Sequence, residues 1–149
     1  MRSIARVVLV VIALDAAIAC NSGPKEGDAM KPAGLREKVQ ALLAELEQQP
    51  PTAYDLGTPQ LAETPAVESL VRMGAVIEPE LIEAMDSSAS RKQVAYAILV
   101  LGRLGEQQAL EPLKRLRERY EGRQSKDEWD FAVIGQCNTA IAELQRHAR

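Results

Sequence analysis

From residue 35 onward, apolar residues recur at the spacing of an α-helix. The first series predicts an amphipathic helix with charged residues on its outer face, and its apolar positions are Leu35, Val39, Leu42, Leu43 and Leu46. This helix should end at Gln49, because Pro50 biases the residue before it away from helical geometry and Pro51 cannot continue a helix. Residues 52–64 are polar and broken by proline and glycine, which predicts a long connection with one turn of helix near Gln60.

A second helix is predicted to start after this connection. Thr64 can cap it through its side-chain oxygen, and Pro65 suits the first helical position. Its inward stripe consists of Val67, Leu70 and Val71. Gly74 should end it.

Residues 77–116 carry the pattern around which the rest of the chain is organised. Residues 77–81 (IEPEL) open a short helix, and residues 110–113 (LEPL) open another one 33 positions later. Between them, Ser90 and Gln93 form a capping box, and residues 94–101 contain no strongly polar side chain. Such a run also fits a buried strand, but the cap and the glycines that follow favour a helix that is apolar on every side. We expect this helix to be the most buried element.

Two further helices follow. In residues 109–120 the inward positions are Leu110, Leu113, Leu116 and Tyr120, and the outward positions are Lys114, Arg115, Arg117 and Arg119. Ser125 and Glu128 then predict a second capping box. The last helix buries the face formed by Trp129, Val133, Cys137, Ala140 and Leu144. Its polar end, residues 145–149, is typical of a water-exposed terminal cap.

Parts of this pattern repeat. Residues 72–74 (RMG) match residues 103–105 (RLG), and residues 94–104 can be laid over residues 134–144 at an offset of 40. Helix pairs that recur at unequal offsets are typical of an α-solenoid. The segments 80–86 (ELIEAMD), 97–105 (AILVLGRLG) and 109–113 (ALEPL), together with Arg91, resemble the HEAT repeat, especially the short bacterial HEAT-like type.

The HEAT resemblance covers residues 65–144 and implies an all-α fold. We therefore expect a short right-handed α-solenoid of antiparallel helix pairs, with about six helices, over residues 35–149. The family implies a protein-binding or scaffolding role rather than a particular chemistry. Composition agrees with packed helices, since one Trp, one Phe and three Tyr leave the core to aliphatic residues.

The N-terminal residues have the three parts of an export signal. Arg2 and Arg6 precede an apolar run at residues 7–14, and small residues precede Cys20. The run is interrupted by Asp15 and is shorter than the roughly 20 residues that span a bilayer, so a retained membrane helix is not expected. Residues 17–20 (AIAC) resemble the lipobox of bacterial lipoproteins, which implies lipidation of Cys20; ordinary secretion is the alternative.

The lipobox divides the chain into a signal peptide (1–19), a lipid-anchored linker (20–34) and the helical domain (35–149). The linker is rich in glycine and proline, which is typical of a flexible tether. By similarity to enteric bacteria, Asn21 implies the outer rather than the inner membrane, with the domain in the periplasm. Residues 20–149 have 16 basic and 20 acidic side chains, a charge of −4, which gives no indication of nucleic acid binding.

Candidate catalytic groups are few. His147 is the only histidine and stands near the end of the chain, which disfavours Ser/His or Cys/His catalysis, and one histidine with Cys137 cannot form a zinc site. Cys137 is expected in the core. The carboxylates Glu78, Glu80, Glu83 and Asp86 are interpreted as helix-start and surface charges. No cofactor or metal is predicted, and an enzyme or enzyme accessory subunit that uses surface carboxylates remains the alternative, favoured if such groups converge in one pocket.

The one concentrated polar feature is the basic run Lys114, Arg115, Arg117 and Arg119, our candidate binding surface. It could bind anionic lipid headgroups, an acidic protein or an anionic glycan. Alternatively, it is a solvated helix end, because cations are favourable there and Glu111, Glu118 and Glu121 lie among them. A small-ligand carrier is a third possibility, but the chain has few aromatic residues to line such a site. The sequence thus predicts a non-enzymatic envelope lipoprotein that binds another protein.

Overall fold

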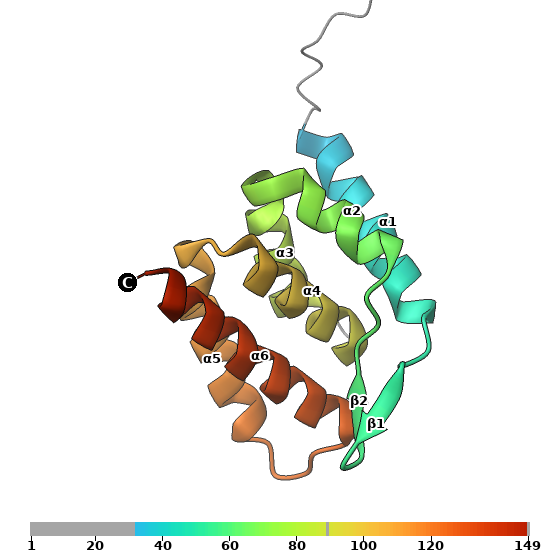
Figure 1. Cartoon of the computed structure of the whole chain (residues 1–149), viewed down its shortest axis with the longest axis vertical. Helices are drawn as coiled ribbons and strands as arrows, with labels where there is room; N and C mark the ends of the chain where they lie inside the picture. Colours follow the sequence, from blue (N-terminus) through green and yellow to red (C-terminus); the bar gives the residue numbers. More distant parts are fainter. Residues whose placement is uncertain (1–31, 89, 149) are drawn as a thin grey trace, which may run out of the picture.

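The computed structural model describes residues 32–88 and 90–148 of the chain. This part is mostly helical, which confirms the all-α class. The helices are α1 (Pro32–Gln48), α2 (Pro65–Met73), α3 (Glu78–Ser87), α4 (Arg91–Leu104), α5 (Leu110–Glu121) and α6 (Glu128–His147), with the short 3₁₀ turns η1 (Gly74–Ile77) and η2 (Gln107–Ala109) (Figure 1). The predicted signal peptide, Cys20 and most of the predicted tether lie outside the described residues. None of the described helices is long and apolar enough to cross a membrane.

The helices pack as consecutive pairs in two layers. Within each pair, α1 contacts α2, α3 contacts α4, and α5 contacts α6. Helices α2, α4 and α6 lie side by side across the face turned to the viewer in Figure 1, and α3 contacts both α1 and α5 on the other side. Helix α4 is central, because it packs against α1, α2, α3 and α6.

Helix α4 is the most buried element, as the sequence predicts. Its residues 94–98 are fully buried, and Val100, Leu101 and Gly102 are buried as well. Gly102 allows a close crossing with α6, since a Cβ atom on it would lie 2.9 Å from the Cβ atom of Ala140. The helix ends where Gly105 adopts a left-handed conformation with φ of 75°.

The predicted helical turn near Gln60 is wrong. Residues 53–60 form a hairpin instead, in which β1 (Ala53–Asp55) pairs antiparallel with β2 (Thr58–Gln60). Leu56 and Gly57 make its two-residue turn with φ values of 47° and 80°. Strand β2 packs on α6, and Pro59 is its buried residue, so tertiary contact decides the conformation of this segment.

Helix caps agree with the sequence in part. The Thr64 side chain accepts from the N–H of Val67, and the Ser90 side chain accepts from the N–H of Gln93, so both N-caps are confirmed. The capping box at Ser90 is incomplete, because the Gln93 side chain does not return to the backbone of Ser90. It accepts from the Ser88 hydroxyl and donates to Glu47 at 2.7 Å instead.

The capping box predicted for Ser125 and Glu128 is wrong. Asp127 caps α6, and its side chain accepts from the N–H groups of Trp129 and Asp130. The Asp130 side chain reciprocates by accepting from the N–H of Asp127 at 3.1 Å. A carboxylate suits the positive end of a helix better than a hydroxyl does, so the helix starts at the aspartate.

Candidate functional site

The predicted basic run on α5 is divided between two neighbouring helices. Arg119 pairs with Asp86 of α3 at 2.9 Å, whereas Arg117 donates to Asn138 of α6 at 3.4 Å. Lys114 pairs with Glu111 on its own helix at 2.7 Å. Arg115 is exposed.

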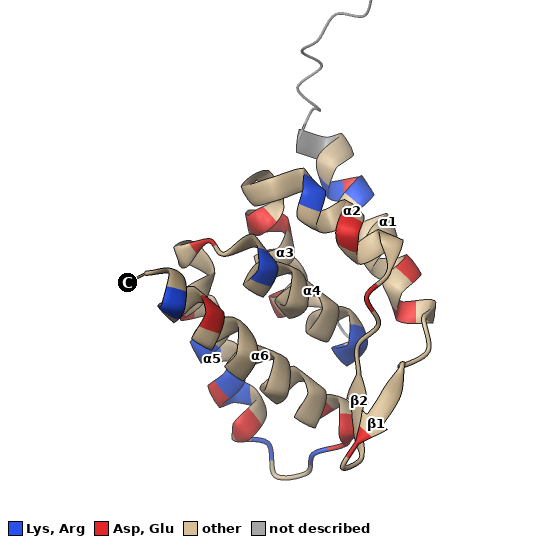
Figure 2. Cartoon of the chain, viewed as in Figure 1, with Lys and Arg blue, Asp and Glu red and all other residues tan. Residues whose placement is uncertain are grey.

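Acidic side chains therefore offset much of the positive charge of this run, as the mixed colours of α5 in Figure 2 show. Arg117 also lies 3.7 Å from Glu121. The four residues Lys114, Arg115, Arg117 and Arg119 do not converge on one ligand-sized site. Their role in binding stays a prediction.

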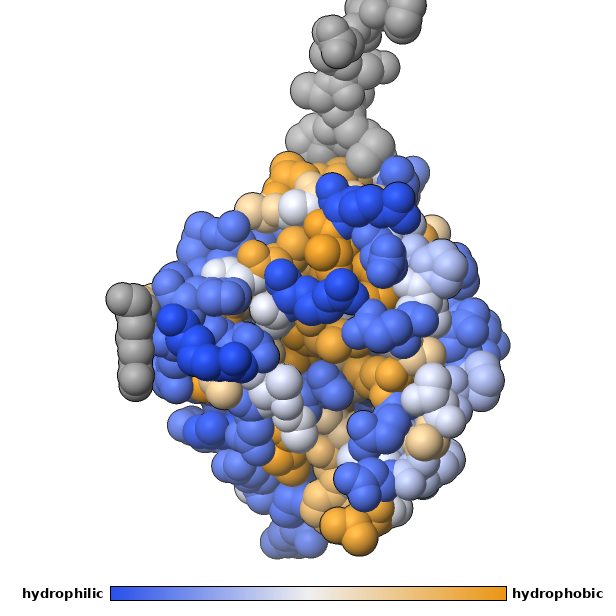
Figure 3. Space-filling view, in the orientation of Figure 1, coloured by the Kyte–Doolittle hydropathy of each residue, from blue (hydrophilic) through white to orange (hydrophobic). Residues whose placement is uncertain are grey.

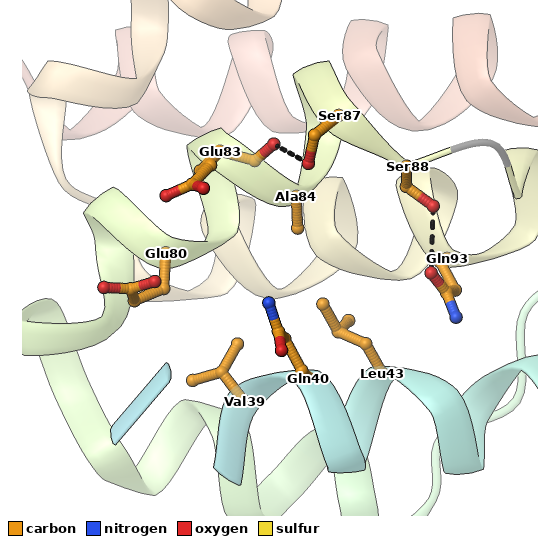
Figure 4. A pocket seen from close by; sticks show the side chains of 9 residues that line it. All are labelled: Val39, Gln40, Leu43, Glu80, Glu83, Ala84, Ser87, Ser88 and Gln93. Atoms are coloured by element: carbon orange, nitrogen blue, oxygen red, sulfur yellow. Dashed lines mark hydrogen bonds between the residues drawn. The ribbon is translucent and has the colours of Figure 1, made fainter. Parts of the chain in front are cut away.

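A cavity of about 340 Å³ lies between α1 and α3. Val39, Gln40 and Leu43 line it from α1, and Glu80, Glu83, Ala84 and Ser87 line it from α3 (Figure 4). Two carboxylates thus lie in the lining of one hollow, which is the arrangement that would favour an enzyme.

The partners of these carboxylates argue against catalysis. Arg36 of α1 donates from Nε to Glu80 at 2.9 Å and from Nη2 to Glu83, so both acids are ion-paired with one guanidinium. The Ser87 hydroxyl donates to the backbone carbonyl of Glu83 at 2.7 Å, so no base activates it. The cluster is better suited to joining α1 to α3 than to proton transfer.

A larger hollow of about 540 Å³ follows the crossing of α4 and α6. Its apolar floor contains Leu99, Gly102 and Ala140, and the Arg103–Glu63 ion pair, with N and O atoms 2.6 Å apart, stands on its rim. Figure 3 shows that apolar surface gathers along the same face, over α2, α4 and α6. We call this hollow the α4–α6 groove.

A buried acidic cluster joins the starts of α4 and α6. Asp130 is buried, forms an ion pair with Arg91 at 3.0 Å and accepts from Arg123 at 2.5 Å. Arg91 also pairs with Asp127. Sequence reasoning missed this cluster, although the pair Asp127 and Asp130, three positions apart ahead of an apolar helix, is itself a capping signal. The cluster satisfies its own charges and therefore reads as structural.

Glu78, at the start of α3, is a second buried acid. Only 4% of its surface is exposed, and its Oε1 atom has no hydrogen-bond partner among the described residues. Burial, followed by the nearby charge of Glu106, raises the pKa of Glu78, and the backbone N–H of Ala109 partly offsets this. Glu78 does not line either of the two hollows described above.

No family model, curated protein or solved structure matches this chain. The function must therefore be inferred from the packing and the surfaces described above.

Cys137 and His147, the two remaining candidate residues, both lie on α6. Cys137 lies in the core, where burial raises the pKa of its thiol to about 12, so it is an unreactive packing residue. His147 is exposed at the end of α6 and lines the α4–α6 groove. Among the described residues, no group of three or more His, Cys, Asp or Glu side chains is placed to hold a metal ion.

Proposed function

We propose that this protein is a non-enzymatic scaffold of the bacterial cell envelope, anchored by lipid at Cys20, whose helical domain binds another protein. In this proposal the domain is a short right-handed α-solenoid of the HEAT-like kind. Repeats of that kind contact only their neighbours and present long surfaces to partners. The domain would stand in the periplasm, at the outer membrane.

The observation that carries the proposal is a series of ion pairs between successive helix pairs. Arg36 of α1 holds Glu80 and Glu83 of α3, and Asp86 of α3 holds Arg119 of α5. In the other layer, α4 and α6 are joined by Arg91 and the two aspartates at the start of α6. Equivalent links between equivalent helices support a stack of repeated units.

The face formed by α2, α4 and α6 is the better candidate for the binding surface. It contains the α4–α6 groove and exposed apolar area, whereas the basic run on α5 is largely ion-paired. Thr139 lies on the wall of the groove and is exposed, so Thr139→Arg would fill the groove without disturbing the core. The triple change of Arg115, Arg117 and Arg119 to Gln tests the other surface.

The experiment compares these two variants with the unchanged full chain by chemical cross-linking in intact cells. We expect Thr139→Arg to remove the cross-linked protein partner and the triple variant to retain it in part. A chain that stays monomeric and partnerless in intact cells would refute the binding role. Mass measurement of the mature N-terminus tests the anchor separately, since an unmodified Cys20 would refute lipidation alone.

The alternative, an enzyme or accessory subunit that uses surface carboxylates, is favoured only by the meeting of Glu80 and Glu83 in the α1–α3 cavity. Their shared ion pair with Arg36 gives both a structural role. Glu80→Gln with Glu83→Gln separates the two ideas. If the two acids only join α1 to α3, the double variant should be less stable than the unchanged chain. If they are catalytic, it should lose turnover while its stability stays unchanged.

A further inference from the structure

The tip of the hairpin carries a residue that neither backbone preference nor packing explains. Leu56 has φ of 47°, a left-handed conformation that glycine, asparagine and aspartate adopt far more readily than leucine. Its surface is 100% exposed. Leucine therefore costs free energy through its backbone conformation at this position, and its side chain gains nothing within the described fold.

Two more exposed apolar residues lie at the same end of the molecule. Tyr54 on β1 is 57% exposed, and Phe131 in the first turn of α6 is 51% exposed. Strand β2 packs against α6, which holds the hairpin beside the start of that helix (Figure 1). Figure 3 shows apolar surface at this end. We call Tyr54, Leu56 and Phe131 the tip patch.

The exposed charges that accompany the tip patch are acidic. Asp55 stands between Tyr54 and Leu56, and Glu128 begins α6; neither has an ion-pair partner among the described residues. The nearest basic residues on the α5–α6 loop are engaged elsewhere, since Arg123 pairs with Asp130 and Lys126 donates to the backbone carbonyl of Arg123 at 2.8 Å. The tip patch is thus apolar, with the unpaired acids Asp55 and Glu128 at its margin; Figure 2 also shows basic residues nearby, in the α5–α6 loop and at the start of α4, where the arginines pair with Asp127 and Asp130.

We propose that the tip patch docks into an apolar pocket, rimmed by Lys or Arg side chains, on a partner protein. Because the margin of the tip patch is acidic, a complementary partner must carry basic side chains around its pocket. A membrane surface is disfavoured, because Asp55 and Glu128 would be desolvated or would face anionic headgroups. A second copy is disfavoured, because a two-fold interface would bring the same acids together.

The distance between α1 and the tip adds a second argument, and this step rests on the proposed function. Helix α1 begins at one end of the longest axis, and the hairpin tip lies toward the other end (Figure 1). In a chain anchored through the segment that precedes α1, the tip is therefore far from the point of attachment, where it can reach another protein.

The experiment introduces the photo-reactive amino acid benzoylphenylalanine at position 54 of the full chain, in cells that make the protein. Two further positions serve as comparisons: Val76, which is apolar and exposed in η1, and Thr139 in the α4–α6 groove. Cross-linked proteins are identified by mass spectrometry, and the binding of the purified partner to the unchanged chain is then measured. Leu56→Asn is the decisive variant, because asparagine suits the left-handed turn and keeps the hairpin folded.

We expect position 54 to yield an adduct with one protein that position 76 does not yield. Leu56→Asn should lower the affinity for that protein about tenfold while the chain stays folded, as expected for an apolar residue at the centre of an interface. Asp55→Lys should lower the affinity about fivefold, and this loss should shrink as salt increases.

Other results would overturn the proposal. An adduct with lipid would indicate a membrane, and an adduct of two identical chains would indicate self-association. Unchanged affinity in Leu56→Asn would show that the tip is not the docking surface. A protein adduct at position 139 without one at position 54 would refute the tip patch and leave the proposed function standing, whereas no protein adduct at either position would refute both.

Discussion

The Nε atom of Arg91, in the first turn of α4, lies 3.0 Å from Oδ1 of Asp130, in the first turn of α6. The Asp130 side chain is only 3% exposed, and it also receives Arg123 and the backbone N–H of Asp127. One buried carboxylate therefore joins α4 and α6, the α5–α6 loop and a helix cap. Its negative charge faces two guanidinium groups and a backbone N–H, which offset the cost of its burial.

Removal of this carboxylate should destabilise the fold. Asp130→Ala leaves Arg123 and the backbone N–H of Asp127 without their acceptor and removes one of the two carboxylates that pair with Arg91, so we expect a loss of about 3 kcal/mol in the free energy of unfolding. Urea denaturation followed by circular dichroism measures it. Glu143→Ala, which breaks only the exposed pair with Arg146, should change stability by no more than about 0.5 kcal/mol. Equal losses in both variants would contradict the role of the cluster.

Two helical glycines, Gly102 and Gly135, should respond in opposite ways to replacement by alanine, because only Gly102 lies at the crossing of α4 and α6. In Gly102→Ala the new methyl group would lie 2.9 Å from the Cβ of Ala140, so the helices must separate, at a cost of about 1–3 kcal/mol. Gly135, on α6, has nothing within 4 Å of its Cβ position. Gly135→Ala should therefore stabilise the protein by about 0.5–1 kcal/mol, through helix propensity. The thermal unfolding midpoints of both variants measure these changes in stability. A higher midpoint in Gly102→Ala would contradict the close crossing of α4 and α6.

The helical part of this fold could be read from local chemistry. The caps at Thr64 and Ser90 and the apolar run at residues 94–98 each follow from neighbouring residues, and all appear in the structure. The hairpin could not be predicted in this way. Its turn places Leu56 against its own backbone preference, and its strands depend on packing against α6, which lies far along the chain.

The candidate sites show the same limit. Periodicity predicts that Arg117 and Arg119 point outward, but it does not show that Asn138 and Asp86, 21 and 33 positions away, receive them. Likewise, Glu80 and Glu83 read as surface charges until Arg36, more than 40 positions earlier, is found to hold both. Long-range ion pairs depend on the packing of helices, which local sequence patterns do not specify.

Glu78 should make stability depend on pH. Its raised pKa means that the folded chain holds a proton there more tightly than the unfolded chain, so its stabilising effect is fully present below the ordinary value of 4.5 and is lost as pH rises through the folded-state pKa. Glu78→Gln removes the buried charge and should raise the free energy of unfolding by about 1 kcal/mol at pH 7. Urea denaturation at pH 4 should show little of this gain. A gain of equal size at both pH values would contradict the argument.

Cys137 should report the opening of the core. The thiolate is the reactive form, and a pKa of about 12 together with full burial leaves almost none of it available at pH 8. In a Cys20→Ser chain, we expect Ellman's reagent to modify Cys137 only as fast as the protein unfolds, and urea should accelerate the reaction. Adding Thr139→Cys on the exposed face of α6 supplies a matched thiol that should react at once. Fast modification of Cys137 in the folded protein would show that α6 separates readily from the helices packed against it, and would contradict the burial described for this residue.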